Sequence, residues 1–145
     1  MKIFIGADHN GFELKHQLID YLKSQSHEVI DEGDAELKKD DDFPMYASRV
    51  ATSVLANDGS LGIALCGSGQ GVCMAANRYK GIRASLVWDE DEARSSRNDD
   101  DSNVLCLPAR QLDFDQARTL VDTWLKTPFA GAERFKRRIK QLDEL

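Results

Sequence analysis

The stretch Leu61–Gly71, LGIALCGSGQG, runs an apolar segment into a cysteine and then into a loop with glycine at every second position. The segment LGIALC has no polar face, which predicts a strand of a parallel sheet covered by helices on both sides. Glycines let backbone N–H groups approach a ligand closely, and the amino end of a following helix attracts negative charge. The stretch therefore predicts an anion site beside Cys66, at the strand end where open parallel sheets bind ligands.

Plainer interpretations of this loop stay open. Buried cysteine is often inert, and a glycine-rich turn can simply join a strand to a helix. The spacing lacks the Gly-Lys-Ser/Thr of a phosphate-binding loop, and its last glycine falls one place early for a dinucleotide turn. The loop therefore gives only weak support to nucleotide binding.

Outward from this strand, apolar and helical segments alternate along the chain. Further strands are predicted at KIFIGAD (2–8), HEVID (27–31), IRASLVW (82–88) and NVLCLP (103–108). Helical patterns lie near residues 10–25, 45–56, 72–79, 90–97 and 113–126. This alternation predicts a three-layer α/β/α sandwich, Rossmann-like, with a five-stranded parallel sheet, and the length of 145 residues fits a single domain, 1–145.

Two segments stand outside that alternation. Residues 32–43 form a polar loop ahead of Pro44, and proline suits the first turn of the helix that follows. The last segment, 130–145, has helical propensity but few apolar positions for packing on its own sheet. We expect this C-terminal helix to dock on a partner subunit.

Charge, hydropathy and cysteine content argue against nucleic-acid-binding, membrane and zinc proteins. A formal charge of −6 argues against nucleic-acid binding, although AERFKRRIKQ (132–141) is locally basic. No apolar run approaches the roughly 20 residues that span a bilayer, and the start of the chain has no signal-peptide pattern, so we expect a cytoplasmic protein with no membrane partner. The three cysteines lack zinc spacing, which predicts reduced thiols and no metal. An acidic chain with one basic segment suggests a small anionic ligand.

Polar candidates follow other predicted strands. Asp8 and His9 come directly after the first strand, so we expect them at the same carboxyl edge as Cys66, although Asp8 also fits an ordinary helix cap or turn. Arg110 follows the last strand and should lie on that edge as well.

Arg134 and Arg138, four residues apart, share a helix face where two guanidinium groups can grip one phosphate. A solvated basic face is the alternative interpretation.

The acidic stretch Asn98–Asp101 precedes the last predicted strand. We expect it at the same edge of the sheet as Cys66. A helix end in a solvated loop explains it, and metal binding is the less favoured alternative, because consecutive carboxylates cannot all face one ion.

Several motifs together identify a family. They are GADHNGFELK (6–15), DFPMYA (42–47), CGSGQGVCMAANRYKGIRA (66–84), SNVLCLPAR (102–110) and WLKTPFAGAERFKRRI (124–139). With these in order over nearly the whole chain, the sequence resembles the type B ribose-5-phosphate isomerases, a family that includes galactose-6-phosphate isomerase subunits. The resemblance implies aldose–ketose isomerisation of a phosphorylated sugar, of the ribose 5-phosphate to ribulose 5-phosphate type, through a cis-enediolate and without a cofactor.

The resemblance also implies roles for individual residues. Cys66 matches the catalytic base, and Ser68 stands where serine or threonine occurs. Some members use a glutamate base at the position of Val72, an option closed in this chain. Backbone amides of the loop match the cradle for the enediolate oxygens, formed by Gly67, Gly69, Gln70 and Gly71. Preorganised donors of this kind stabilise the charge that develops in the transition state.

Further positions match substrate contacts of the family. Asp8 matches a residue that hydrogen-bonds sugar hydroxyls. The phosphate-binding positions are matched by His9, Arg110, Arg134 and Arg138. The family builds its site across a dimer interface, so we expect a homodimer or homotetramer with shared active sites.

One departure concerns Asp99 and Asp100, which replace the usual histidine and asparagine. The histidine is assigned to sugar ring opening, and an ionised carboxylate cannot donate the proton that this step needs. The replacement leaves three alternatives open: another substrate such as a tetrose or hexose phosphate, a non-catalytic sugar-phosphate-binding subunit, or a subunit that needs a paralogous partner.

Overall fold

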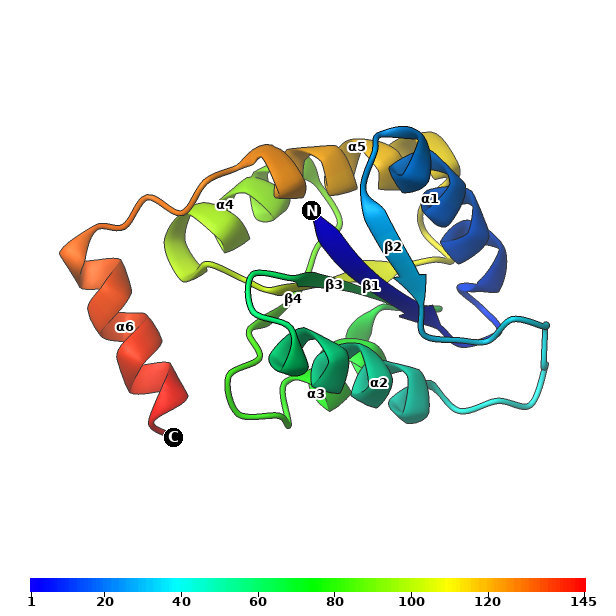
Figure 1. The fold of residues 1–145 in the computed structure, drawn as a ribbon, viewed down its shortest axis with the longest axis horizontal. Helices are drawn as coiled ribbons and strands as arrows, with labels where there is room; N and C mark the ends of the chain where they lie inside the picture. The colour runs from blue at the N-terminus through cyan, green and yellow to red at the C-terminus, as the bar shows by residue number, and fades with distance from the viewer.

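Five parallel strands form the centre of the molecule, with helices on both faces, in a computed structural model that describes residues 1–145 (Figure 1). The strands are β1 (Lys2–Ala7), β2 (Glu28–Asp31), β3 (Leu61–Cys66), β4 (Ala84–Leu86) and β5 (Val104–Pro108). Their order in the sheet is β2-β1-β3-β5-β4, and every neighbouring pair is parallel. The predicted fold class and all five predicted strands are confirmed.

The chain forms six helices, and three of them begin at starting signals in the sequence. The six are α1 (Phe12–Ser24), α2 (Phe43–Ala56), α3 (Gln70–Ala76), α4 (Glu90–Asp100), α5 (Phe114–Lys126) and α6 (Glu133–Asp143). Those with starting signals are α2, α4 and α5. Pro44 lies in the first turn of α2, as predicted. Asp113 and Gln116 form a capping box that starts α5, and each satisfies a backbone N–H of the other.

Helix α4 is longer than its sequence pattern predicts. The pattern ends near residue 97, whereas α4 continues to Asp100. Polar bonds hold this extra turn in place: the buried Trp124 indole donates to Ser102 Oγ at 2.8 Å, and Ser102 Oγ lies 3.1 Å from Ser96 Oγ. Tertiary packing, which a local pattern does not contain, therefore sets the end of the helix.

Side chains of each strand alternate between two apolar clusters, one on each face of the sheet. Ile3 and Ile5 pack with α1 and α5 on one face, and Phe4 packs toward α2 on the other. Cys66 and Cys106 belong to the second cluster. Both faces of the sheet are buried, which is why the central strands have no polar side.

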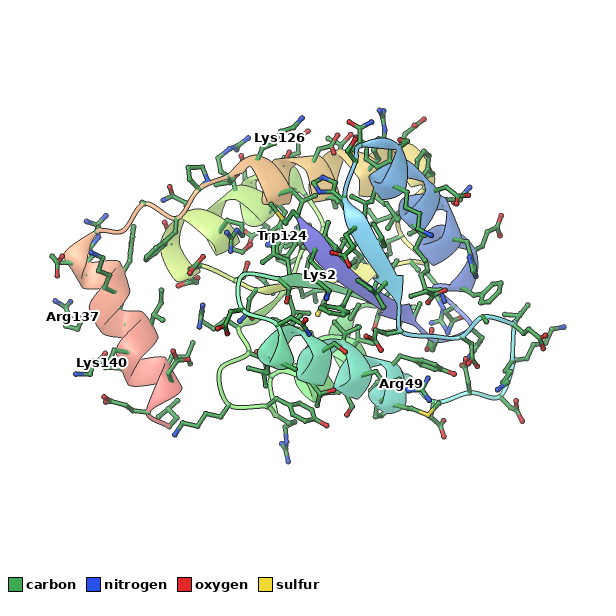
Figure 2. All side chains as sticks on the ribbon, viewed as in Figure 1. Lys2, Arg49, Trp124, Lys126, Arg137 and Lys140 are labelled. Carbon is green, nitrogen blue, oxygen red and sulfur yellow. The ribbon has the colours of Figure 1, made fainter.

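Helix α6 lies apart from this sandwich. In Figure 1 it stands at one end of the molecule, beyond α4, and packs on no strand. Arg137 and Lys140 project outward from it in Figure 2. Its one buried residue is Phe135, so most of its surface faces solvent in the single chain. None of the helices combines the length and apolar character that crossing a membrane requires.

Candidate active site

The strand order creates a switch point between β1 and β3. From β1 the chain moves to β2 on one side, while β3 and the later strands lie on the other side. Ala7 pairs with Leu65 in the ladder, and Asp8 N donates to Leu65 O at 3.3 Å. Asp8 and Cys66 therefore lie at the ends of adjacent strands, at the crevice where open α/β sheets bind ligands. This predicted placement is confirmed.

The glycine loop follows Cys66 with almost no room for side chains. A β-carbon on Gly67 would come within 2.8 Å of the Arg110 guanidinium carbon. Gly69 has φ +73°, and a β-carbon there would meet Leu86 Cδ1 at 2.6 Å. Position 69 requires glycine because of its positive φ and its close backbone neighbours, whereas a side chain at Gly67 would displace the flexible end of Arg110. With glycine at both positions, the backbone of the loop stays bare beside Cys66.

Arg110 lies against this loop, as predicted. Its backbone N–H donates to Gly67 O at 3.0 Å, because β5 is the neighbour of β3, and its side chain is exposed. Ser68 Oγ accepts a hydrogen bond from Gln70 N at 3.3 Å, which holds the turn into α3. The loop thus combines backbone donors with a free guanidinium group.

Cys66 is nearly covered in the single chain. It is 5% exposed and packs in the cluster that contains Val72 and Cys106. Five hollows on the surface of the chain are lined by other residues. In the single chain, packed neighbours therefore cover most of this thiol.

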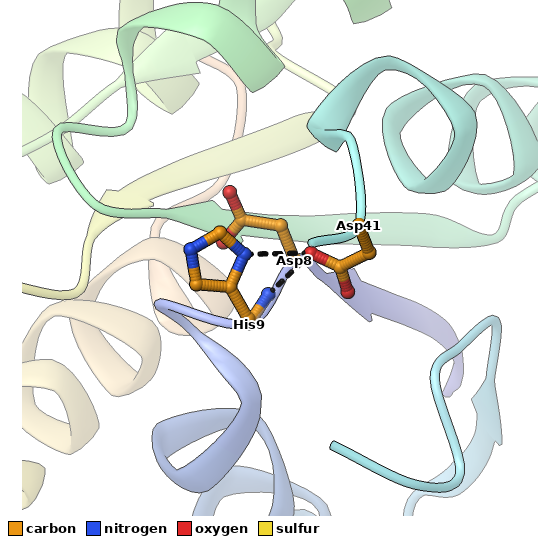
Figure 3. Close-up of side chains that lie close together, drawn as sticks. All are labelled: Asp8, His9 and Asp41. Atoms are coloured by element: carbon orange, nitrogen blue, oxygen red, sulfur yellow. Dashed lines mark hydrogen bonds and ion pairs between the residues drawn. The ribbon is translucent and has the colours of Figure 1, made fainter. Parts of the chain in front are cut away.

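Asp8, His9 and Asp41 form a group at the same edge (Figure 3). Oδ1 of Asp41 accepts from His9 N at 2.9 Å and lies 2.7 Å from His9 Nδ1. The hydrogen bond to Asp41 raises the pKa of His9, and burial raises the pKa of Asp8. Asn10 N donates to Asp8 Oδ1 at 2.9 Å, which fixes that carboxylate.

These three side chains also have the residue types of a metal site. Their potential ligand atoms lie within 4.8 Å of one another. His9 Nδ1 is bonded to Asp41 Oδ1, whereas His9 Nε2 has no partner in the chain. His9 and Asp41 are hydrogen-bonded to each other, the carboxylate of Asp8 is bonded to Asn10 N, and we do not assign the three as metal ligands.

Sequence reasoning missed Asp41. The only signal was the run Asp40–Asp42 in a polar loop, where any of the three carboxylates could face solvent. Of the three, only Asp41 has a largely buried side chain, 4% exposed, and its partner His9 lies in the turn just after β1. Such a contact between a loop and a strand end has no pattern in the local sequence.

The expectation that Asp99 and Asp100 lie at the edge of Cys66 is wrong for a single chain. Helix α4 runs antiparallel to the strands, so its last residues lie at the amino edge of the sheet, just before β5. Asp99 accepts from Asn98 Nδ2 at 2.8 Å. The Asp100 carbonyl accepts from Arg83 Nε at 3.0 Å.

The arginines of α6 lie near the amino edge of the sheet, where α4 ends. Burial, followed by the charge of Asp99, raises the pKa of Asp100, while Arg138 and Arg83 oppose that rise. Arg134 stacks on the neighbouring Phe135 ring at 4.3 Å. Both predicted arginines are exposed on one helix, as expected, but they lie with Asp99 and Asp100 rather than with Cys66.

Comparison with known proteins matches the chain over nearly its whole length. Residues 3–142 match the family model described as Ribose/Galactose Isomerase. The probable ribose-5-phosphate isomerase B of Mycoplasma pneumoniae is 47% identical over 93% of this chain and 89% of that protein. The ribose-5-phosphate isomerase B of Mycobacterium leprae is 40% identical over 99% of this chain and 89% of that protein.

Solved structures match the fold equally well. A ribose 5-phosphate isomerase from Thermotoga maritima superposes with a TM-score of 0.95 at 44% identity, covering 99% of this chain and 98% of its own. The ribose-5-phosphate isomerase B of Mycoplasma genitalium, solved with bound ribulose-5-phosphate, superposes with a TM-score of 0.95 at 42% identity, covering 99% and 94%.

Proposed function

This chain belongs to the ribose/galactose isomerase family and is a sugar-phosphate isomerase, and we propose that it interconverts an aldose phosphate and a ketose phosphate of the ribose 5-phosphate type with Cys66 as the base. The observation that carries this proposal is the juxtaposition at the switch point. A thiol ends β3, bare backbone donors follow it, and Asp8, His9 and Arg110 lie around the same edge. We include residues 1–145 in one such isomerase domain.

In the proposed reaction, the Cys66 thiolate removes the proton from C2 of the open-chain aldose. The released electron pair forms the C1–C2 double bond and moves negative charge onto O1. Amides of the Gly67–Gly71 loop stabilise that oxyanion, an interaction worth several kcal/mol when the donors are preorganised. Return of the proton to C1, with transfer of the O2 proton to O1, gives the ketose.

Phosphate binding is the role we give to the basic residues. His9 and Arg110 supply it from the carboxyl edge, and Arg134 and Arg138 supply it from α6. Asp8 accepts from a sugar hydroxyl, which its fixed and buried carboxylate supports. The bound ribulose-5-phosphate in the Mycoplasma genitalium relative supports a ligand of this class.

We propose that two chains share each site, in a homodimer or homotetramer. Within one chain the α6 arginines lie with Asp99 and Asp100 at the amino edge, away from Cys66. Within the chain, helix α6 packs mainly on α4, and its Asp143 pairs with Arg83, so most of its surface stays exposed. Docking of α6 from one chain over the Cys66 edge of another would bring the two halves together and enclose the thiol.

A second substrate class is favoured by Asp99 and Asp100. These carboxylates stand where the family commonly has histidine and asparagine, so no imidazole is available there to open a sugar ring. A tetrose phosphate cannot close a stable ring and needs no such group, and a hexose phosphate is the other alternative. A non-catalytic subunit, or one that needs a paralogous partner, would bind sugar phosphate without turning it over alone.

Deuterium exchange at the sugar carbons tests the proposal. The protein is incubated in D2O with aldose phosphates of four, five and six carbons, and label at C1 or C2 is followed by NMR. Exchange that disappears in Cys66→Ala supports the base assignment, and the preferred sugar defines the substrate. Absence of exchange with every sugar, with binding retained, would contradict an independent catalyst.

A further inference from the structure

The loop ahead of α2 contributes one buried carboxylate to the carboxyl edge. The side chain of Asp41 is 4% exposed, although its neighbours Asp40 and Asp42 are exposed. Its Oδ1 accepts two bonds from one residue, the backbone N–H and the ring Nδ1 of His9, at 2.9 and 2.7 Å. In Figure 3 both bonds converge on the same oxygen. This carboxylate is therefore directed at His9 and not at solvent.

The double contact fixes the proton on the histidine ring. An ionised carboxylate oxygen only accepts hydrogen bonds, so Nδ1 of His9 must be the donor. The opposite ring nitrogen, Nε2, has no partner in the chain, and the side chain is 32% exposed. A proton on Nε2 makes the ring a cation, and the carboxylate on the other side stabilises that cation.

The loop is held in place at its other end as well. Lys15 Nζ, fully buried, donates to Asp31 Oδ1 at 2.7 Å and to Asp34 O at 2.6 Å. Tyr46 OH donates to Asp34 Oδ2 at 2.7 Å. Anchors on α1 and α2 therefore fix the loop before it reaches Asp41, which gives His9 a preorganised partner.

We propose that Asp41 is a positioning residue that holds His9 in the protonated form and in the orientation that binds the substrate phosphate through Nε2. The inference rests on the proposed function for the identity of the ligand, but not for the pairing itself. A purely structural role, in which Asp41 only ties the loop to β1, is the competing explanation.

Several charged groups surround His9 and enter its titration. Asp8 and Asp41 favour the protonated ring, whereas Arg110 opposes it. The hollow that His9 borders is also lined by groups of α1, including Glu13 and His16. Because the bond to Asp41 is the largest of the influences that raise the pKa, its loss should lower the pKa of His9. Anion binding through His9 should then weaken as pH rises, and should do so at a lower pH in the variant.

The unaltered protein offers the first test. Proton–nitrogen NMR correlations of the His9 ring should show Nδ1 protonated throughout the titration, with a pKa above that of an ordinary histidine. A neutral ring that carries its proton on Nε2 would overturn the proposal. This measurement involves no turnover, so its failure is distinct from failure of the isomerase assignment.

Binding of inorganic phosphate to four variants separates positioning from structure. At neutral pH, Asp41→Asn should weaken phosphate binding about fivefold, while the matched control Asp40→Asn leaves it unchanged. In a His9→Ala background, the same Asp41→Asn change should alter binding by less than about 1.5-fold, since the two residues act as one unit. An equal loss in both backgrounds, or no loss in either, would overturn the proposal. The His9 pKa should fall in Asp41→Asn and stay constant in Asp40→Asn.

Discussion

The two edges of the sheet carry functional groups in different physical states. At the carboxyl edge, Asp8 and Cys66 are each 5% exposed and continue directly from strands of the core. At the amino edge, Arg134 and Arg138 are exposed on α6, and neither forms an ion pair within the chain. The first group is fixed by the fold of one chain. The second is free to meet an anion or another chain.

In the proposed function, the two edges have different roles that match this difference. Proton transfer needs a base held to within a fraction of an ångström, which strand ends and glycine loops provide. Phosphate binding by guanidinium tolerates approach from a separate element, because the group is always charged and donates in a fixed fork. In an isomerase site assembled from both edges, one chain would supply the precisely held base, and its partner would supply the guanidinium groups of α6.

The largest effect should come from Cys66. Cys66→Ala removes the proposed base and should lower the rate of deuterium exchange by at least about 10³-fold. Cys106→Ala is the matched control, because Cys106 is a buried thiol in the same cluster, and it should keep the rate within about threefold. Similar losses in both variants would point to packing and remove the contrast between the edges.

The second largest effect should be on substrate binding, through the arginines of α6. Arg138→Ala should raise the KM for the phosphorylated sugar by about 10- to 30-fold, through loss of a charge-assisted contact, with a smaller change in kcat. Arg137, whose side chain projects outward from the same helix, serves as the control and should change neither constant. If steady-state kinetics give equal KM values for the two variants, α6 does not bind the phosphate.

The ion pair of Lys15 with Asp31, which anchors the 32–42 loop, should contribute to the free energy of unfolding. Asp31→Asn leaves the fully buried Lys15 ammonium without its anionic partner and should lower the free energy of unfolding by about 1 to 2 kcal/mol in urea melts. Asp20→Asn, an exposed change on α1, should stay within about 0.5 kcal/mol. Equal stabilities would mean that the loop, and Asp41 with it, is not held as described.

The smallest effect concerns Asp100. Burial and Asp99 raise its pKa, so the ionised form disfavours the folded state above that pKa, and this penalty disappears as pH falls below it. Asp100→Asn should therefore stabilise the chain by about 0.3 kcal/mol near neutral pH, a small value because the group is mostly exposed. Melts near pH 4 should show a smaller difference between the two proteins. A difference that grows on acidification would contradict the assigned cause.

The sequence predicts the carboxyl edge well for a physical reason. The apolar period, the strand ends and the glycine loop are local features, and parallel topology then brings Asp8, Cys66 and Arg110 to one edge without further information. The same logic placed Asp99 incorrectly. A residue just before a strand lies at the amino edge, and the contacts of the adjacent Asp100 with Arg83 and Arg138 show which residues lie around it there.

Other features depend on contacts between distant segments. The inward orientation of Asp41 is held by its bonds to His9, 32 residues away in the sequence, and the end of α4 is held by the bonds of Trp124 and Ser102. Neither leaves a periodic pattern in the sequence. The proposed roles of Arg134 and Arg138 are harder still to predict, because a single chain does not bring these side chains to the thiol.

Co-expression of two variants, each impaired in a different part of the site, tests the shared site most directly. One chain carries Cys66→Ala and the other carries Arg134→Ala with Arg138→Ala, and the two are co-expressed in equal amounts. Random pairing makes half of the dimers mixed, each with one intact site, so about a quarter of the parent activity should return at low substrate. Activity no greater than the average of the separate variants would contradict a site built from the carboxyl edge of one chain and the α6 arginines of another.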